Sequence, residues 1–535
     1  MDWQRANLIL INGNIITIDG RRPFGRAVAV HDNRIIFVGA SKEALSLAAP
    51  RATVIDLKGR TVLPGLIDNH CHFMQTGYAA NDIDLQGKNT VADIKETIAI
   101  ASRFFPPGSI IRGFGYDDYQ FPDGVPPSRW DLDAAAPDHL VWLNRIDLHS
   151  SVANSRFLNN LEIPLDTAGL EIDEQGVVTG RLRSEADRIA REFSSRLIGP
   201  ETRGVALREA VRQALRTGVT TVCAMEGGDD SQDMDADFLL YNQGQLPLRV
   251  EVFYQTRDIA KVVGLGLRRI GGCILVDGSF GSRTAALLEP YADDPENYGY
   301  LYFDQHELDD FVEQVHMAGL QLSMHVIGDR AIELMLNSLE KVITKYPRPD
   351  HRHRIEHFEL PTREHIERAR KLGLVLSVQP AFEYFWGGAE NMYGERLGPE
   401  RVLRTNPLRT MLKRGLLIAG GSDSAVTPLD IILAIHAAVN HPNKNESVEI
   451  FEAVRMFTLD GAKALFREKE LGSITPGKLA DMVVLAEDPC AITARTLKSM
   501  NVDMTIVGGK IVYDREGAIP LFELGGQKIN VREGF

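Results

Sequence analysis

The chain has 535 residues, of which 44% are hydrophobic and 25% charged. This composition is typical of globular proteins, and the length allows a barrel of roughly 250 residues with large additions. A net charge of -14 without a long basic stretch makes nucleic acids and anionic membranes poor partners, so we expect a small-molecule substrate instead. No apolar run reaches the roughly 18 residues of a membrane span, and residues 1–14 lack the apolar core of a signal peptide, so we expect a cytoplasmic protein.

Short β-branched runs separated by turn residues occur at both ends of the chain, a pattern typical of small antiparallel sheets. The runs lie at 8–11, 14–17, 34–38 and 53–57, and again at 480–485, 504–507 and 510–513. Each set alone has too few strands to bury a hydrophobic face. We therefore expect residues 1–57 and 470–535 to form one composite β-sandwich domain.

Residues 58–469 alternate apolar strands with helical stretches, which indicates a parallel α/β sheet. Predicted helices at 206–216, 306–318, 363–372 and 399–414 each precede an apolar run. Polar residues of the metal-binding type end several strands, and a closed barrel brings such ends together at one face. We predict an α/β fold with a (β/α)₈ TIM-type barrel over 58–469. Residues 75–200 fit the alternation poorly and are predicted to be a large inserted subdomain after the first barrel strand, covering the site.

The first apolar strand ends in a His-x-His element, His70-Cys71-His72. Side chains alternate faces along a strand, so His70 and His72 point to the same side and Cys71 points away. Two imidazoles placed in this way can bind one ion.

Three later apolar segments also end in residues that can bind a metal. They deliver His325, His357 and Asp423, the last into a glycine-rich turn. Each residue alone is explained better by a capping or surface role than by a metal. Together they give the order His-x-His, His, His, Asp at four strand ends of one predicted barrel, which favours a metal site.

Six segments resemble the amidohydrolase superfamily, and within it the amidohydrolase-3 or YtcJ-like branch, across essentially the whole chain. They are PGLIDNHCH at 64–72, DGSFGSRTA at 277–285, HVIGDRA at 325–331, HRIEH at 353–357, GSD at 421–423 and GSITPGKLAD at 472–481. The resemblance implies a barrel with a composite β-sandwich from both termini. It also implies hydrolysis of amide or related C–N bonds, including those of N-substituted formamides.

The same resemblance implies roles for individual residues. His70 and His72 would ligate one metal position, and His325 and His357 a second position or its remnant. Asp423 would be a ligand and the base that transfers protons. We expect a divalent metal, with zinc preferred, although imidazole–carboxylate sites also accept iron, manganese or cobalt.

One residue departs from the family pattern. The family usually has a lysine four residues before the Asp-Gly-Ser element, where carboxylation makes it a bridging ligand, and here that residue is Cys273. A thiolate is a good zinc ligand, and the position at a strand end favours Cys273 as a ligand. The alternative is a buried thiol that packs as a small hydrophobic side chain. Whether the site holds one ion or two depends on which role Cys273 has, and both counts stay open.

Four further residues are candidates for substrate binding. His149 belongs to an element similar to the family's Asp-Gly-His, with Leu148 in place of the glycine, although a surface turn explains it equally well. Ser282 and Arg283 follow a barrel strand and could bind a substrate oxygen or carboxylate. Glu226 ends an apolar strand and could line the cavity.

The sequence thus predicts a metal-dependent hydrolase that cleaves an amide, N-formyl or N-acyl C–N bond of a small molecule. Metal-activated water would attack, with Asp423 as general base. The alternative is a catalytically impaired relative that binds a small molecule and acts as a regulator. Cys273 in place of lysine supports this alternative, and the retained histidines and Asp423 argue against it. A homodimer is left open.

Overall fold

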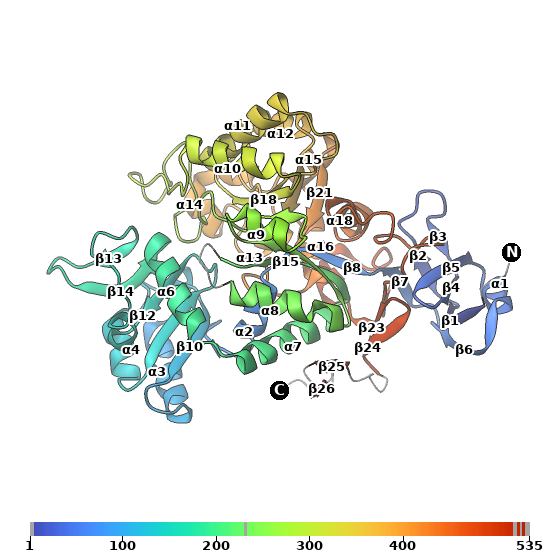
Figure 1. The fold of residues 1–535 in the computed structure, drawn as a ribbon, viewed down its shortest axis with the longest axis horizontal. Helices are drawn as coiled ribbons and strands as arrows, with labels where there is room; N and C mark the ends of the chain where they lie inside the picture. Colours follow the sequence, from blue (N-terminus) through green and yellow to red (C-terminus); the bar gives the residue numbers. More distant parts are fainter. Residues whose placement is uncertain (1–4, 229–232, 517–521, 525–526, 530–535) are drawn as a thin grey trace.

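The structure, a computed structural model, describes residues 5–228, 233–516, 522–524 and 527–529. At its centre, eight parallel strands curl into a nearly closed barrel (Figure 1). In chain order they are β8 (Leu66–Cys71), β15 (Val219–Glu226), β16 (Arg249–Tyr254), β17 (Arg269–Ile270), β18 (Gln321–Val326), β19 (Arg354–His357), β20 (Val375–Val378) and β21 (Leu417–Gly420). The predicted TIM-type barrel is confirmed.

The first and last strands, β8 and β21, meet through the residues that follow them. The backbone N–H of Asp423 donates to the carbonyl of His70, and that of His72 to the carbonyl of Ser424, each at 2.8 Å. Gly421 allows this approach, because a Cβ there would lie 2.6 Å from the backbone nitrogen of His70. Closure brings the carboxyl ends of all the strands to one face.

Amphipathic helices cover the outside of the barrel. In α11 (Asp329–Lys345) the buried residues Ile332, Met335, Leu336 and Leu339 recur at helical spacing and face the sheet. Other helices of this layer are α7 (Pro200–Arg216), α8 (Met234–Asn242), α9 (Ile259–Gly264), α10 (Gln305–Met317), α12 (Arg363–Lys371), α13 (Pro380–Phe385), α16 (Ile431–Val439), α17 (Ile450–Met456) and α18 (Leu459–Ala464). Among the described residues, no helix is both long enough and apolar enough to span a membrane.

The single helix predicted at 399–414 is wrong. The chain forms α14 (Met392–Arg401), continued by the 3₁₀ helix η4 (Val402–Arg404), and then α15 (Leu408–Lys413), with three non-helical residues before α15. Pro407 explains the break, because a proline disfavours the helical conformation of the residue before it. That residue, Asn406, has φ of 42°.

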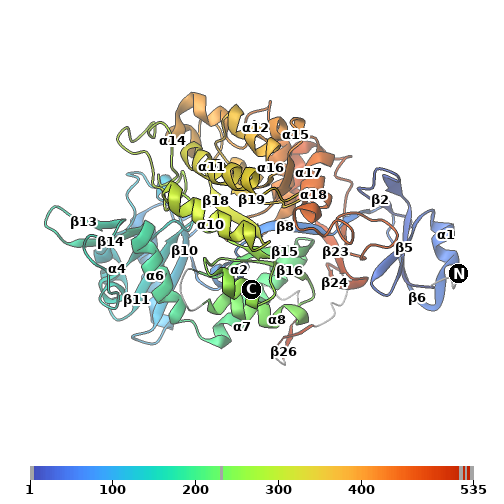
Figure 2. The same ribbon diagram turned by 45° about the horizontal axis from the view of Figure 1, so that its top comes forward.

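The segment between β8 and β15 forms a separate α/β layer at one end of the molecule, far from the N-terminal sheet in both views (Figures 1 and 2). Its strands pair in the order β13-β14-β12-β11-β10-β9. They are β9 (Ile83–Asp84), β10 (Ile110–Tyr116), β11 (Leu140–Arg145), β12 (Ser150–Ala153), β13 (Leu170–Ile172) and β14 (Val178–Arg183), accompanied by α3 (Val91–Ala101), α4 (Arg129–Ala135), α5 (Ser155–Leu158) and α6 (Ser184–Arg196). The helix α2 (Phe73–Ala79), directly after β8, packs instead on α7 and β15 of the barrel. Alternation along β11 places Val141 and Leu143 in one hydrophobic cluster and Trp142 in another, so both faces of this sheet are covered.

Strands from both ends of the chain pair in one six-stranded sheet, in the order β24-β23-β22-β7-β2-β3. They are β2 (Asn14–Ile16), β3 (Phe24–Gly25), β7 (Thr61–Pro64), β22 (Met482–Leu485), β23 (Val502–Val507) and β24 (Lys510–Asp514). The antiparallel pairing of β22 with β7 joins the two ends of the chain. β7 lies directly before β8, the first barrel strand.

The second sheet near the N-terminus is mixed, which corrects the prediction of an antiparallel one. Its order is β5-β4-β1-β6, from β1 (Ala6–Ile11), β4 (Ala27–His31), β5 (Arg34–Gly39) and β6 (Ala48–Asp56). Because the chain crosses over through α1 (Ser41–Ser46), β6 runs parallel to β1. Leu10 and Val30 of this sheet pack with Val62 and Val484 of the other. β25 (Phe522–Leu524) pairs with β26 (Gln527–Ile529), while residues 1–4 and 530–535 of the predicted composite domain lie outside the described residues.

Candidate metal centre and substrate cavity

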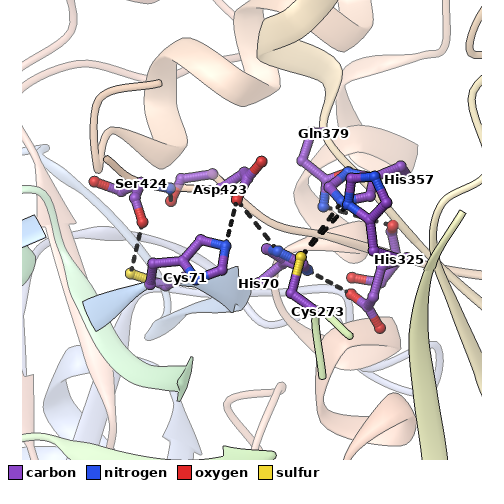
Figure 3. Close-up of polar contacts among 12 residues, drawn as sticks. His70, Cys71, Cys273, His325, His357, Gln379, Asp423 and Ser424 are labelled. Atoms are coloured by element: carbon purple, nitrogen blue, oxygen red, sulfur yellow. Dashed lines mark hydrogen bonds and ion pairs between the residues drawn. The ribbon is translucent and has the colours of Figure 1, made fainter. Parts of the chain in front are cut away.

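The carboxyl ends of the barrel strands bring the predicted ligands together (Figure 3). His70 and His72 come from the end of β8, His325 from β18 and His357 from the end of β19, and Asp423 follows β21. Cys273 joins them from the long segment after β17. Apart from His70 and His72, which share β8, the ligands come from different strands, so closure of the barrel determines their relative positions.

One group of ligand atoms surrounds Asp423. Its Oδ1 lies 3.2 Å from Nε2 of His70 and 3.3 Å from Nε2 of His72. Atoms of these three residues all lie within 4.8 Å of one another. The Sγ of Cys71 lies instead 3.7 Å from Oγ1 of Thr76, on the side away from Cys273 (Figure 3).

A second group surrounds the thiol of Cys273, and it shares His70 with the first. Atoms of His70, Cys273 and His357 lie within 4.8 Å of one another. The Sγ of Cys273 is 3.5 Å from Nδ1 of His325 and 4.0 Å from Nε2 of His357. Cys273 therefore lies between the His70 group and the two later histidines (Figure 3).

The residues present fit a divalent metal ion. Nε2 of His70 and Oδ1 of Asp423 are buried and form no hydrogen bond with any described residue, although they are 3.2 Å apart. Buried polar atoms are almost always satisfied, so two such atoms facing each other indicate a missing partner. Imidazole nitrogen, thiolate sulfur and carboxylate oxygen are the donor types that bind zinc.

The histidines are held by contacts on their far nitrogens. Nδ1 of His70 lies 2.7 Å from Oε2 of Glu356, and Nδ1 of His357 lies 2.7 Å from Oε1 of Gln379. Because carboxylate and amide oxygens accept, each Nδ1 carries the proton and each Nε2 keeps a free lone pair. Nε2 of His325 lies 3.2 Å from the carbonyl of Gly278, which likewise leaves its Nδ1 toward Cys273. Such contacts orient metal-binding histidines.

Electrostatics favour the ionised forms of the acidic ligands. Burial opposes ionisation of the Cys273 thiol, but the facing imidazoles of His325, His357 and His70 outweigh burial and lower its pKa well below the usual value. Burial likewise opposes ionisation of Asp423, and contacts with His70 and His72 lower its pKa. Both side chains are thus suited to bind a cation.

Two ligands occupy strained backbone positions. His357 has φ of 69° and Asp423 φ of 55°, in the left-handed region that non-glycine residues rarely adopt. Such conformations cost on the order of 1–3 kcal/mol and persist where the surrounding structure holds them. Leu148 also has a positive φ of 57°, at the position where the family's Asp-Gly-His element has glycine.

A cavity with about 390 Å³ of empty space, part of it open to solvent, lies beside the ligand cluster. Its lining combines cluster residues with side chains of the insertion and of the segments after β17, β19 and β20. The residues are Arg145, Asp147, His149, Ser279, Phe280, Gly281, His325, Ile327, His357, Glu359, Phe382, Trp386, Met392, Tyr393, Asp423 and Val426. His149 is the predicted substrate residue that lies here, with its ring 5.1 Å from that of His325.

The other predicted substrate residues lie outside this lining. Ser282 donates to Oδ2 of Asp147 at 2.7 Å, and Arg283 is paired with Asp293 at 2.7 Å. Both line a neighbouring polar cavity of about 360 Å³ between the insertion and the barrel. Glu226 is buried behind the cluster, where it accepts a hydrogen bond from the backbone of Met74, and burial raises its pKa to about 8.

Several residues of the site carried no signal strong enough to single them out. Glu356 lies inside a recognised segment, but alternation of side chains along β19 would put it on the opposite face from His357, so the pattern does not predict its contact with His70. Gln379, Glu359 and Tyr393 also could not have been found, because their positions depend on how separate segments pack.

Comparisons with known proteins agree with this architecture. The model of the amidohydrolase family matches residues 53–513. Protein LONG AFTER FAR-RED 3 of Arabidopsis thaliana is 30% identical over 540 residues, 95% of this chain and 92% of that protein. N-substituted formamide deformylase of Arthrobacter pascens is 28% identical over 552 residues, 96% of this chain and 100% of that protein. An uncharacterized metal-dependent hydrolase from Pyrococcus horikoshii OT3 has a crystal structure that matches with a TM-score of 0.74 at 27% identity, covering 91% of this chain and 99% of that one. This chain belongs to the amidohydrolase family.

Proposed function

We propose that the protein is a metal-dependent hydrolase that cleaves a C–N bond of a small amide, N-formyl or N-acyl compound. One observation carries the proposal. At the barrel mouth, beside a cavity, Nε2 of His70 and Oδ1 of Asp423 face each other, buried and without hydrogen bonds. Family membership and the similarity to N-substituted formamide deformylase support C–N chemistry.

The ligand set accommodates one or two ions, with zinc the preferred metal. His70, His72 and Asp423 would hold one position, and Cys273, His325 and His357 would hold or complete a second. A bound divalent ion lowers the pKa of water from about 15.7 toward 7 and polarises a carbonyl oxygen.

In this proposal Asp423 is the general base. Its low pKa keeps the carboxylate ionised at neutral pH, ready to accept a proton from the attacking water at a carboxylate oxygen. Asp423 lines the cavity, so it can then deliver that proton to the leaving nitrogen. Glu356 and Gln379 keep His70 and His357 in the tautomers whose Nε2 atoms can bind a cation.

The test is metal analysis together with hydrolysis of a panel of N-formyl and N-acyl compounds by the metal-loaded protein. We expect bound metal, release of amine, and loss of both in His70→Ala. Tight binding of a panel compound by the metal-loaded protein without hydrolysis would instead support the small-molecule-binding regulator.

A further inference from the structure

The cavity contains a buried carboxylate that the proposed mechanism does not use. Glu359 follows β19 and is 1% exposed. Its Oε2 accepts a hydrogen bond from the hydroxyl of Tyr393 at 2.8 Å. Its Oε1 is buried and has no hydrogen-bond partner among the described residues, although Glu359 lines the cavity. Because buried acceptors are rarely left unsatisfied, this oxygen indicates a donor that arrives with a ligand.

The cavity offers little to a negatively charged ligand. Among the described residues that line it, the single arginine or lysine is Arg145. Its guanidinium already faces Asp117, Asp118 and Asp147, at 2.8, 2.5 and 3.1 Å. Three carboxylates more than neutralise one guanidinium, so the group around Arg145 carries a net negative charge and does not attract a substrate carboxylate.

Part of the cavity wall is aromatic. Phe382 lies stacked beside the ring of His357 and edge-on to Trp386, with ring centroids 6.0 and 5.3 Å apart. Phe280 packs edge-on against Tyr393, with ring centroids 5.1 Å apart. An aromatic ring therefore lies next to the tyrosine whose hydroxyl donates to Glu359. This wall suits an apolar substituent, because aromatic side chains bury large apolar surfaces.

We propose that Glu359 is a substrate-binding residue whose Oε1 accepts a hydrogen bond from the N–H of a secondary amide, and that the site selects uncharged amides with an apolar N-substituent over N-acyl amino acids. This inference rests on the proposed function. It adds that the substrate is uncharged and that its amide N–H donates a hydrogen bond to the enzyme. Tyr393 keeps the other oxygen of Glu359 engaged, so Oε1 stays available as an acceptor.

The test crosses a change in the protein with a change in the substrate. Wild type, Glu359→Leu and Glu359→Gln, all metal-loaded, are assayed on N-(2-phenylethyl)formamide and on its N-methyl analogue, which lacks the N–H. A hydrogen bond to Oε1 predicts that the preference of wild-type kcat/KM for the N–H compound falls roughly threefold to tenfold in Glu359→Leu. Glu359→Gln keeps an acceptor oxygen and should retain part of the preference. Glu333→Gln, a partly exposed glutamate on α11, should leave it unchanged.

A third compound tests charge selection. N-formylphenylalanine has the same skeleton with one added carboxylate, and wild type should hydrolyse it at least tenfold less efficiently than N-(2-phenylethyl)formamide. An unchanged N–H preference in both Glu359 variants, or equal efficiency on the acid, would overturn the inference.

Failure of the proposed function is distinguishable from failure of this inference. If metal-loaded wild type hydrolyses neither these three compounds nor any other of the N-formyl and N-acyl panel, the hydrolase proposal fails. Calorimetric binding of the same two formamides to wild type and to Glu359→Leu then measures the N–H preference directly. Equal affinities in both proteins would reject the role of Glu359.

Discussion

At the residue scale, Cys273 stands where the family usually has a lysine, and its sulfur lies between His70 and the two later histidines. We expect Cys273→Ala to lower bound metal and activity together, because the ion loses a soft donor. Cys273→Ser should restore little, since an un-ionised hydroxyl is a weak ligand. Elemental analysis beside His70→Ala as the positive control measures this.

The packing alternative for Cys273 predicts a different result. Cys273→Ala would then reduce the free energy of unfolding by about 1 kcal/mol and leave metal content unchanged. Alkylation adds a second readout, because a metal-bound thiolate in wild type should react more slowly than the thiol of the metal-free protein. Full metal occupancy and normal turnover in Cys273→Ala would end the ligand hypothesis.

Asp423 allows a separate prediction at the same scale. Asp423→Asn is near-isosteric, so the fold and most of the metal should remain. An amide cannot accept the proton from water at neutral pH, so kcat should fall by about 10²–10⁴. Steady-state kinetics with metal content measured on the same preparation checks this. Turnover equal to wild type would refute Asp423 as the base.

At the scale of elements, strand β19 couples barrel stability to the metal centre. Arg354 and Glu356 are both buried on it, with Nε and Nη2 of Arg354 2.8 Å from the two carboxylate oxygens, and Glu356 also contacts His70. Burial opposes ionisation of Glu356, but Arg354 and His70 lower its pKa to about 2. One side chain thus holds a buried guanidinium and a proposed ligand.

We expect Glu356→Gln to lower the free energy of unfolding by about 3–5 kcal/mol, because Arg354 is left buried without a counter-charge. Metal affinity should fall about 10–100-fold, since His70 loses its orienting carboxylate. Glu333→Gln, which breaks a more exposed pair with Arg368, should cost about 1 kcal/mol or less. Denaturant titration and metal competition measure both. A destabilisation no larger than that of the control would contradict the prediction.

The pH dependence follows from the lowered pKa of Glu356. Its folded pKa of about 2 lies below the usual 4.5, so its contribution to stability is present above about pH 4.5 and is lost as the pH falls toward 2. The stability difference between wild type and Glu356→Gln should therefore shrink over that interval. Denaturant titrations of both proteins between pH 6 and 3 would show it.

At the scale of the whole molecule, the two ends of the chain share one sheet and one hydrophobic cluster. A chain ending at residue 465 would lose β22, β23 and β24 and expose the edge of β7. It would also uncover Val62, which packs against Val484. We expect this truncated chain to be insoluble or non-cooperative in thermal unfolding. A soluble, cooperative and active truncated protein would contradict a composite domain.

The residue pattern alone was sufficient to predict the barrel. Alternating strands and helices require a parallel sheet, and alternation of side chains along β8 places His70 and His72 on one side. The ligand order His-x-His, His, His, Asp could be read in the same way, because each ligand belongs to one strand end. Local preferences also predicted the strands at both ends, although not that β6 runs parallel to β1.

Tertiary structure decided what depends on contacts between distant segments. Closure of β8 against the chain after β21 brings Asp423 to the histidines, and the segment after β17 brings Cys273 to His357. Glu359 meets Tyr393 only because the segments after β19 and β20 pack together over the barrel mouth. The physical reason is the distance along the chain over which each interaction acts. Helical hydrogen bonding, turn preferences and side-chain alternation act within a few residues and are visible in the sequence. Burial, charge pairing and cavity shape arise between segments that lie tens to hundreds of residues apart.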